Sequence, residues 1–240
     1  MTLKKLTKFP VLDKGYIVYT DSMGNDLSIV NAARVSFKKE SKVFNEKDEQ
    51  LLNYCLREGH TSILRHCTVQ FEIKAPLLVA RQWFRHVVSS THLEEQNGWN
   101  EASQRYITHD LEFYVPSQWR KAAKNKKQGS DGTIEEERSA YLSKTLKEQQ
   151  DISLESYNNL VAEGVAPEQA RLFLPAYGLY VYWRWTASLE SILNFLVQRL
   201  DSHAQYEIQQ YAKAVKNIVQ PLFPLSTSLY LKYNGVGDVD

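Results

Sequence analysis

The chain of 240 residues is poor in cysteine, with only Cys55 and Cys67. Two cysteines cannot build a disulfide framework, and without a CxxC pair there is neither zinc-finger nor thioredoxin spacing. We therefore expect a reducing, cytoplasmic location. The start, MTLKKLTKFPVLDKGY, lacks the apolar core of a signal peptide. No apolar run is long enough to span a bilayer, which predicts a protein without a membrane partner.

Glycine-rich phosphate loops and an excess of one charge are also missing. The net charge is +1, so no global field favours binding to nucleic acid. Neither GxGxxG nor GxxxxGK[ST] occurs, so a nucleotide would not be held by a glycine-rich loop. The other way to bind a phosphate is arginine, whose planar guanidinium pairs with two oxygens at once. Any anion must therefore be bound by local clusters.

The spacing of apolar residues predicts an α+β fold with more helix than strand, in one domain covering residues 1–240. We expect helices at 26–37, 46–60, 76–86, 134–164, 166–175 and 189–223, the last broken near Asp201. We expect strands within 15–26, 67–76, 111–116 and 177–188. A polar loop at about 88–99 and a flexible charged segment at about 121–133 interrupt this pattern.

The segment RQWFRHVVSSTHLEEQNGWNEASQRY, residues 81–106, concentrates charged and aromatic side chains. Arg81 and Arg85 lie four residues apart in a helical pattern, and Arg105 follows beyond the polar loop. A single arginine of this kind is most often a solvated surface residue. Here Trp83 and Phe84 interleave the charges, and large aromatics are seldom left exposed in such a group. The pattern favours a pocket for an anion or a planar ring.

A second group is EGHTSILRHC, in which His60 follows a glycine that ends a helix and Ser62 stands close behind. A lone histidine is more often structural or merely exposed than catalytic. His60 and His66 could in principle bind a metal, but HExxH is absent and no carboxylate stands at matching spacing. We expect no metal site.

A third group is NFLVQRLDSHAQYEIQQYA, where Asn194, Arg199 and His203 recur near helical spacing amid leucines. Polar side chains this close to an apolar face destabilise the fold unless they are paired. One interpretation is that Arg199 faces a ligand. The other is a structural salt bridge from Arg199 to Asp201 or Glu207, and the residues alone do not decide between them.

Together these groups resemble one family, the flavin-dependent thymidylate synthases (ThyX). The matching blocks run from about Leu12 to about Tyr233 and include GHTSILRH, KAPLLVARQWFRH, NEASQRY, EFYVP, ARLFLP and NFLVQRLDSHAQYEIQQYA. The resemblance implies a ThyX-type α+β domain, a β-sheet packed with helices, that assembles as a homotetramer with shared active sites. It also implies reductive methylation of dUMP to dTMP, with methylenetetrahydrofolate as carbon donor and FAD reduced by NADPH as the source of hydride.

The resemblance assigns roles to individual residues. It implies dUMP contacts from Gln82, Arg85, Glu101, Ser103, Gln104, Arg105, Arg171 and Arg199. It implies FAD contacts from Ser62, Arg85, His86, Glu101, Ser188 and Asn194. It implies catalytic roles for Arg199, as the group that ionises the uracil ring, for Ser103 and for His60. The arginine role is physically sensible because neither cysteine has an obvious activating partner, whereas a guanidinium can stabilise a developing ring anion.

The chain departs from the family pattern in two places. The signature RHR, seven residues and serine is replaced by Arg85-His86-Val87, and the spacing to Ser103 is longer by eight residues. An Asn-x-Arg that contacts FAD in many relatives is replaced by Ser188 and Glu190, and a carboxylate near a pyrophosphate would be repulsive.

These departures lead to a hypothesis and two alternatives. The hypothesis is an altered or weaker FAD pose, with His92 or Trp99 of the inserted loop replacing the lost contacts. One alternative is a related folate-dependent enzyme that installs a different one-carbon group, such as hydroxymethyl, on a pyrimidine nucleotide. The other is a dUMP-binding homologue with lost or altered FAD binding. Retention of Arg199 argues against this last reading.

Overall fold

A computed structural model describes residues 3–86, 98–103, 109–124 and 129–237 of the chain. It is a mixed domain of helices and one main antiparallel sheet, as the sequence predicts. The sheet has five strands in the order β1-β2-β3-β7-β4. Their bounds are Lys8–Val11 for β1, Gly15–Met23 for β2, Thr68–Pro76 for β3, Tyr180–Ser188 for β7 and Gly98–Glu101 for β4.

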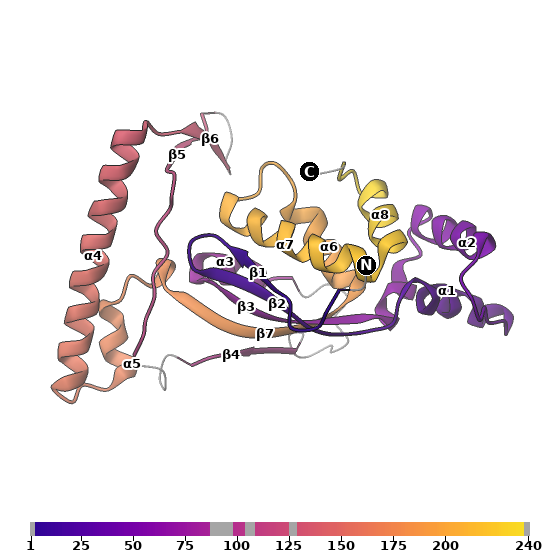
Figure 1. Cartoon of the computed structure of the whole chain (residues 1–240), viewed down its shortest axis with the longest axis horizontal. Coiled ribbons are helices and arrows are strands. Elements are labelled where there is room, and N and C mark those ends of the chain that lie inside the picture. Colours follow the sequence, from indigo (N-terminus) through magenta and orange to yellow (C-terminus); the bar gives the residue numbers. More distant parts are fainter. Residues whose placement is uncertain (1–2, 87–97, 104–108, 125–128, 238–240) are drawn as a thin grey trace.

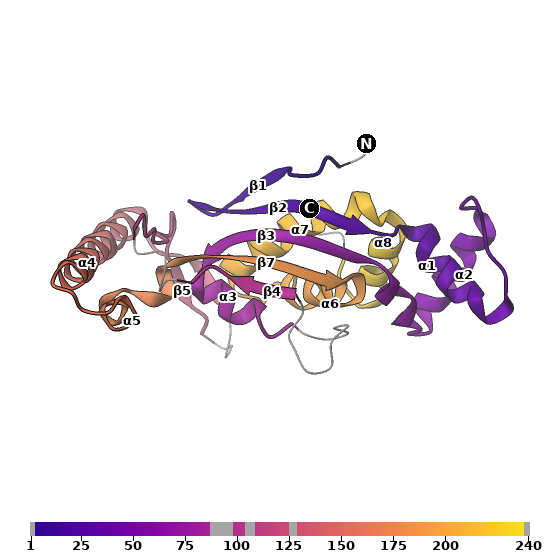
Figure 2. The same ribbon diagram turned by 90° about the horizontal axis from the view of Figure 1, so that it is seen from below.

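The strand alternation found in the sequence decides which face of the sheet is covered. Val69, Phe71 and Ile73 of β3 are fully buried, since they point toward the helices. Figure 1 shows α6 (Leu189–Arg199) and α7 (Tyr206–Leu222) together on one side of the sheet. Figure 2, seen from below, shows the strands in front of α6 and α7, which therefore cover only the far face of the sheet in that view.

An aromatic cluster joins the sheet to its helices. Trp83, the last residue of α3 (Leu77–Trp83), stacks on Phe195 of α6 with ring centroids 4.5 Å apart. It also meets Trp183 and Trp185 of β7 edge to face. Aromatic pairs of this kind stabilise a fold by about 1 kcal/mol each beyond the area they bury. The end of α3 is therefore fixed against both the sheet and α6.

One end of the sheet is extended by a helical group. It contains α1 (Asp26–Arg34), η1 (Val35–Phe37), α2 (Glu46–Arg57), η2 (Thr61–His66) and α8 (Pro224–Tyr233). As predicted, Asn45 caps α2, and the chain leaves this helix at Gly59, whose φ is +73°.

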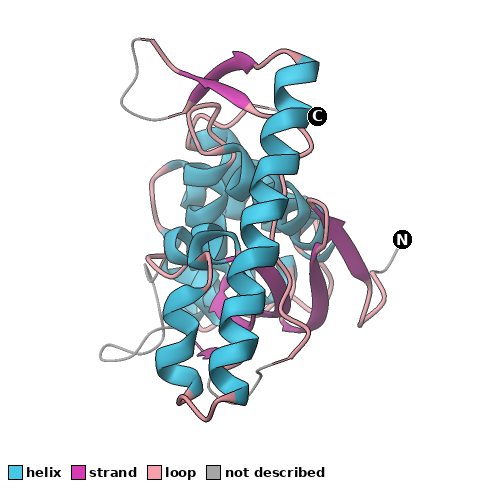
Figure 3. Cartoon of the chain, turned by 90° about the vertical axis from the view of Figure 1, so that its left-hand side faces the viewer, coloured by secondary structure: helices cyan, strands magenta, loops and turns pink. Residues whose placement is uncertain are grey.

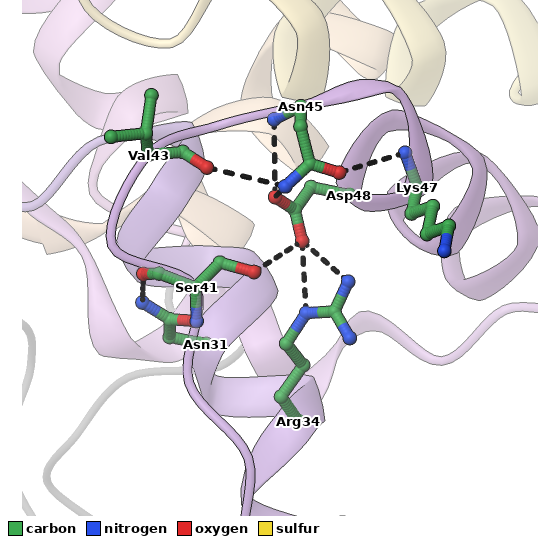
Figure 4. A network of polar contacts seen from close by, with 7 residues as sticks. All are labelled: Asn31, Arg34, Ser41, Val43, Asn45, Lys47 and Asp48. Atoms are coloured by element: carbon green, nitrogen blue, oxygen red, sulfur yellow. Dashed lines mark hydrogen bonds and ion pairs between the residues drawn. The ribbon is translucent and has the colours of Figure 1, made fainter.

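A polar network locks α1 to the start of α2 (Figure 4). Asp48, which has no exposed surface, accepts hydrogen bonds from Arg34, Ser41 and Asn45. Burial is the largest influence on the pKa of Asp48 and raises it. The hydrogen bonds from Ser41 and Arg34 outweigh burial and hold the pKa below its usual value. Asp48 is therefore an ionised, fully paired part of the fold.

A helical arm projects from the other end of the sheet (Figures 1 and 3). It consists of α4 (Glu136–Ala162), α5 (Pro167–Ala170), η3 (Arg171–Phe173) and η4 (Ala176–Gly178). A small second core holds it together, formed by Phe113, Tyr157, Ala170, Leu174 and Leu179. The hairpin of β5 (Arg120–Ala122) and β6 (Ser130–Thr133) lies at the upper end of α4 in Figure 3.

Three sequence expectations need correction. Residues 111–116 form no strand, and Phe113 makes only an isolated bridge to Leu179, because its side chain packs into the arm. The segment 121–133 is not wholly flexible, since parts of it pair as β5 and β6; residues 125–128 lie outside the described residues. Of the polar loop at 88–99, residues 88–97 lie outside the described residues, while Gly98 and Trp99 pair with β7.

The elements β1 and α8 are also absent from the sequence prediction. Within the described residues, no helix combines the length and the apolar character that crossing a membrane requires. Cys55 and Cys67 are both buried and both free.

Candidate active site

A cavity of about 540 Å³ opens where α3, the α6–α7 turn and the β5–β6 hairpin meet. Gln82 lies in the last turn of α3, Arg85 follows the C-cap of this helix at Phe84, and Arg199 is the last residue of α6. These are three of the residues for which the family resemblance implies dUMP contacts. The full lining consists of Gln82, Arg85, Arg120, Gly129, Ser130, Arg199, His203, Ala204, Gln205 and Tyr206.

The apolar faces of two helices bring these polar groups together. α6 buries Leu193, Phe195 and Leu196 against the sheet, which leaves Arg199 at its open C-terminal end. α3 is fixed through Trp83, so Gln82 and Arg85 emerge on either side of a rigid anchor. A cavity held by packed helices is well suited to positioning a ligand.

Arg199 is held by a histidine rather than by a carboxylate. Its Nε donates a hydrogen bond to Nε2 of His86 at 3.0 Å. His86 is 5 % exposed, and burial, followed by the charge of Arg199, lowers its pKa to about 4. His86 is therefore neutral near pH 7 and accepts the bond. Burial, followed by the charge of Arg85, also lowers the pKa of Arg199, yet the group stays protonated.

The two carboxylates considered as salt-bridge partners of Arg199 pair with other side chains. Asp201 pairs with Nδ1 of His203 at 2.8 Å, and Glu207 pairs with Arg120 at 2.6 Å. The ligand-facing interpretation of Arg199 is the one that this geometry supports.

The electrostatic character of the cavity follows from its lining. Among the described residues, its wall contains three arginines and no carboxylate. Arg120 and Arg199 are half-buried and Arg85 is exposed, and a group of cations of this kind attracts a negatively charged ligand and stabilises negative charge that develops in a reaction. The wall is thus suited to the anion that the arginine clusters in the sequence predict.

A chain of hydrogen bonds runs from the cavity wall to the buried Glu207. Gln82 donates to the side-chain oxygen of Gln205 at 2.6 Å, and Gln205 in turn donates to Glu207 at 2.8 Å. Glu207 also accepts from Arg120 and from the hydroxyl of Tyr114. The amide of Gln82, a predicted dUMP contact, is thereby held in one orientation.

A second polar group lies at the other end of α6. Glu190, 6 % exposed, accepts from Nε of Arg65 at 2.5 Å and from the hydroxyl of Thr61 at 2.5 Å. Ser188 caps the helix by accepting from the backbone N–H of Ser191. The carboxylate that the sequence led us to regard as repulsive is compensated by Arg65, whose side chain is 54 % exposed.

Two more predicted flavin contacts, Ser62 and Asn194, lie on this side or along α6, whereas Arg85 and His86 lie at the cavity and Glu101 ends β4. Ser62 is the second residue of η2, which begins directly after His60. The ring of His60 meets that of Tyr54 edge to face. Asn194 is half-buried midway along α6 and accepts from Gln198. Since α6 has 11 residues, its two ends are about 16 Å apart. One chain therefore holds the Glu190 group and the cavity at opposite ends of the same helix.

Several predicted nucleotide contacts do not reach the cavity within one chain. Arg171 lies in η3 of the arm and donates to the carbonyl oxygen of Glu168. Glu101 ends β4 and Ser103 follows it, and neither lines the cavity. Gln104 and Arg105 lie outside the described residues.

The hypothesis about the inserted loop is only partly visible. Val87 and His92 lie outside the described residues. Trp99 stacks on Trp183 with centroids 4.7 Å apart and meets Phe84 edge to face. Its ring packs on the sheet, so this geometry gives no support to a flavin contact from Trp99.

Sequence reasoning missed Arg120, Gln205, Tyr206 and Arg65. Arg120 precedes a stretch interpreted as flexible, and its pairing partner Glu207 is 87 residues away in the sequence. The adjacent Trp119, which is half-buried, was the available signal that this segment is packed. Arg65 lies within the matched block GHTSILRH, but its distance along the sequence from other charged residues gave no sign of a functional role.

Together, the antiparallel sheet, the covering helices and the arginine-lined cavity define an α+β protein with a site suited to an anionic ligand. The model of the family described as thymidylate synthase complementing protein matches residues 18–225. A flavin-dependent thymidylate synthase of Thermotoga neapolitana is 42% identical over 232 residues, covering 97% of this chain and 98% of that protein. One from Thermus thermophilus is 41% identical over 221 residues, covering 92% and 77%.

A solved structure is also similar to this chain. The crystal structure of the UMP/dUMP methylase PolB from Streptomyces cacaoi, bound with 5-Br dUMP, superposes with a TM-score of 0.79. The identity is 25%, with 93% of this chain and 97% of that chain covered. The chain belongs to the thymidylate synthase complementing protein family, that of the flavin-dependent thymidylate synthases.

Proposed function

We propose that this protein catalyses the reductive methylation of dUMP to dTMP, with methylenetetrahydrofolate and NADPH as co-substrates. The observation that carries the proposal is Arg199, held by neutral His86 in a cavity whose described wall has no carboxylate, beside Gln82 and Arg85. Support also comes from the relatives named as flavin-dependent thymidylate synthases and from the related methylase bound with 5-Br dUMP.

The chemistry requires activation of a uracil ring, which is a poor nucleophile. A cysteine could add to the ring, but burial raises the pKa of Cys55 and raises that of Cys67 to about 12. Neither thiol is a ready nucleophile. A guanidinium at the ring can instead stabilise the negative charge that develops there, an effect of roughly 3 kcal/mol for a well-placed donor. Arg199 is the residue that we assign to this role.

His86 shapes this role. Because it accepts from Nε of Arg199, the two terminal amino groups of the guanidinium remain to face a ligand. A neutral imidazole holds the arginine without cancelling its charge, as a carboxylate would. The pair thus orients a full positive charge at the cavity wall.

The residues at the start of α6 fit a flavin cofactor. Ser62 and Asn194 are polar groups near Arg65, an exposed cation suited to a pyrophosphate. Ser188 and His60 complete this side, and His60 keeps its proposed catalytic role. When bound, FAD supplies the hydride that the methylation requires, after reduction by NADPH. Arg85 and His86 at the cavity are the proposed contacts of its reactive end.

The separation of these two groups supports a homotetramer with shared sites. FAD-side and nucleotide-side residues occupy opposite ends of α6, and Arg171 stands on the projecting arm. We propose that Glu101, Ser103, Gln104, Arg105 and Arg171 complete the dUMP site from neighbouring subunits, and that Ser103 has a catalytic role there. The buried free thiols suit a reducing compartment, and the proposal includes a cytoplasmic location.

The test is the visible absorption spectrum of the purified full-length protein with FAD, before and after addition of dUMP. Flavin bands that stay with the protein through gel filtration, and that shift on adding dUMP, are expected. A colourless protein that binds dUMP would contradict the proposal and favour a nucleotide-binding homologue without flavin chemistry.

A further inference from the structure

We infer that Arg120 is a third ligand-binding arginine of the cavity and that its ligand is the phosphate group of the nucleotide. The inference rests on the proposed function for the identity of the nucleotide. Arg120 belongs to none of the sequence blocks that carry the family resemblance.

The position of Arg120 is fixed on two sides. Its guanidinium lies over the ring of Tyr206, with Cζ 4.7 Å from the ring centroid. One terminal nitrogen donates to Oε1 of Glu207 at 2.6 Å. A stacked and anchored arginine loses little conformational freedom when it binds an anion.

The ion pair with Glu207 does not use up the binding capacity of Arg120. Glu207 also accepts from Tyr114 and Gln205, so its two oxygens are shared among three side chains. It is 3 % exposed and does not line this cavity, whereas Arg120 does. A guanidinium has five N–H donors, and the bond to Glu207 occupies one. In this ion pair, Arg120 faces the cavity and Glu207 holds it from the side away from this cavity.

The contacts of Glu207 determine its charge state. Burial is the largest influence on the pKa of Glu207 and raises it. The hydrogen bonds from Arg120 and Gln205 outweigh burial, so the pKa lies below its usual value. Glu207 is ionised near neutral pH and keeps Arg120 in place.

The hairpin that carries Arg120 adds further donors on the same side of the cavity. Ser130, at the start of β6, contributes a hydroxyl to the wall. Gly129 has a φ of +90°, and a Cβ there would lie 3.4 Å from the carbonyl oxygen of His203. The hairpin therefore approaches the α6–α7 turn closely. An arginine fork beside a hydroxyl is a donor set typical of phosphate recognition, while Arg199 with His86 faces the base.

A purely structural ion pair is the competing explanation. It predicts that loss of Arg120 lowers stability but changes the binding of every ligand equally. A phosphate contact predicts a loss that depends on whether the ligand carries a phosphate.

The experiment measures binding of dUMP and of deoxyuridine, which lacks the phosphate, to the full-length protein by competitive titration. Arg120→Gln should weaken dUMP binding on the order of 10- to 100-fold and leave deoxyuridine within about twofold. Arg120→Lys, which keeps the charge for Glu207 but lacks the fork, should give an intermediate loss. The matched control is Arg138→Gln, since Arg138 also lies over a tyrosine ring, that of Tyr141, but on exposed α4.

Two results would overturn the inference. One is unchanged dUMP binding in Arg120→Gln. The other is an equal loss for dUMP and deoxyuridine in Arg120→Lys, if its melting temperature matches the wild type.

Inorganic pyrophosphate, as a second probe, separates this inference from the proposed function. Wild-type protein that ignores dUMP but binds pyrophosphate through Arg120 would uphold the anion site and defeat the proposed function. Wild-type protein that binds neither would defeat both.

Discussion

Arg65 and Glu190 form an ion pair of 2.5 Å that joins η2 to the start of α6. Glu190 stands where the family resemblance led us to expect a flavin-contacting arginine. The structure thus offers a cation near this place from a different element, with the carboxylate holding it. A positive charge is therefore present near this place, but it comes from Arg65 of η2 instead of from α6.

The first prediction concerns this pair. Arg65→Gln removes the exposed cation and should weaken FAD retention about tenfold, as expected for one charged hydrogen-bonded contact. Glu190→Gln keeps Arg65 and should not weaken it. Flavin fluorescence titrations of the full-length protein measure both. An exposed pair on the open sheet face, Arg184 with Glu72, offers Arg184→Gln as control. Equal FAD affinity in wild type and Arg65→Gln would show that Arg65 does not supply the cation that binds FAD.

The second prediction concerns the Asp48 network. Asp48→Ala leaves Arg34 without its buried partner and removes the acceptor for Ser41 and Asn45. We expect a loss of about 3 kcal/mol in the free energy of unfolding, measured by urea denaturation. Asp21→Ala, which breaks an exposed ion pair with Lys5, should change it by less than about 1 kcal/mol. Similar effects for the two variants would show that the network does not stabilise the fold.

The third prediction is a pH dependence carried by His86. Its pKa is about 4 in the folded protein, against 6.5 for the unfolded side chain. Between these values the unfolded state binds more protons, so stability rises with pH and is lost as pH falls from 6.5 toward 4. The full effect is roughly 3 kcal/mol.

His86→Gln removes this titration and keeps an acceptor for Arg199. Urea denaturation of wild type and variant at about pH 7 and about pH 4.5 isolates the contribution of His86, since all other groups are shared. The wild type should lose more stability than the variant over this interval. Parallel losses would mean that His86 is not buried and neutral.

The fourth prediction separates binding from catalysis at Arg199. Arg199→Lys keeps a positive charge but loses the fork and the Nε bond to His86. We expect kcat to fall on the order of 100-fold, with a change in dUMP affinity of only a few-fold. The control is Arg184→Lys, which should leave both unchanged. A variant whose affinity falls as much as its kcat would make Arg199 a binding residue only.

Local patterns predicted much of the fold. The alternation of Val69, Phe71 and Ile73 in β3, the Asn45 cap of α2 and the break between α6 and α7 all follow from nearby residues. The segment 111–116 alternates like a strand, yet Phe113 belongs to the core of the arm, which only tertiary packing decides. The hairpin of β5 and β6 lies in charged sequence and is held by contacts far along the chain, through Arg120 to Glu207.

The site was predictable to the extent that it rests on matched blocks. Gln82, Arg85 and Arg199 meet at one cavity, as the resemblance implies. The contacts that surround them were not predictable, because the partners of Arg199 and Glu190 come from distant segments. His86 is 113 residues from Arg199, and Arg65 is 125 residues from Glu190. No spacing rule connects residues at such separations.

The central claim is that this protein converts dUMP to dTMP with Arg199 as the activating group. The most direct measurement is mass spectrometry of the nucleotide formed from dUMP, methylenetetrahydrofolate, NADPH and FAD, by wild type and by Arg199→Lys. We predict the mass of dTMP from the wild type and a much slower appearance of the same product from the variant. A hydroxymethylated nucleotide, or dTMP formed equally fast by both proteins, would contradict the account.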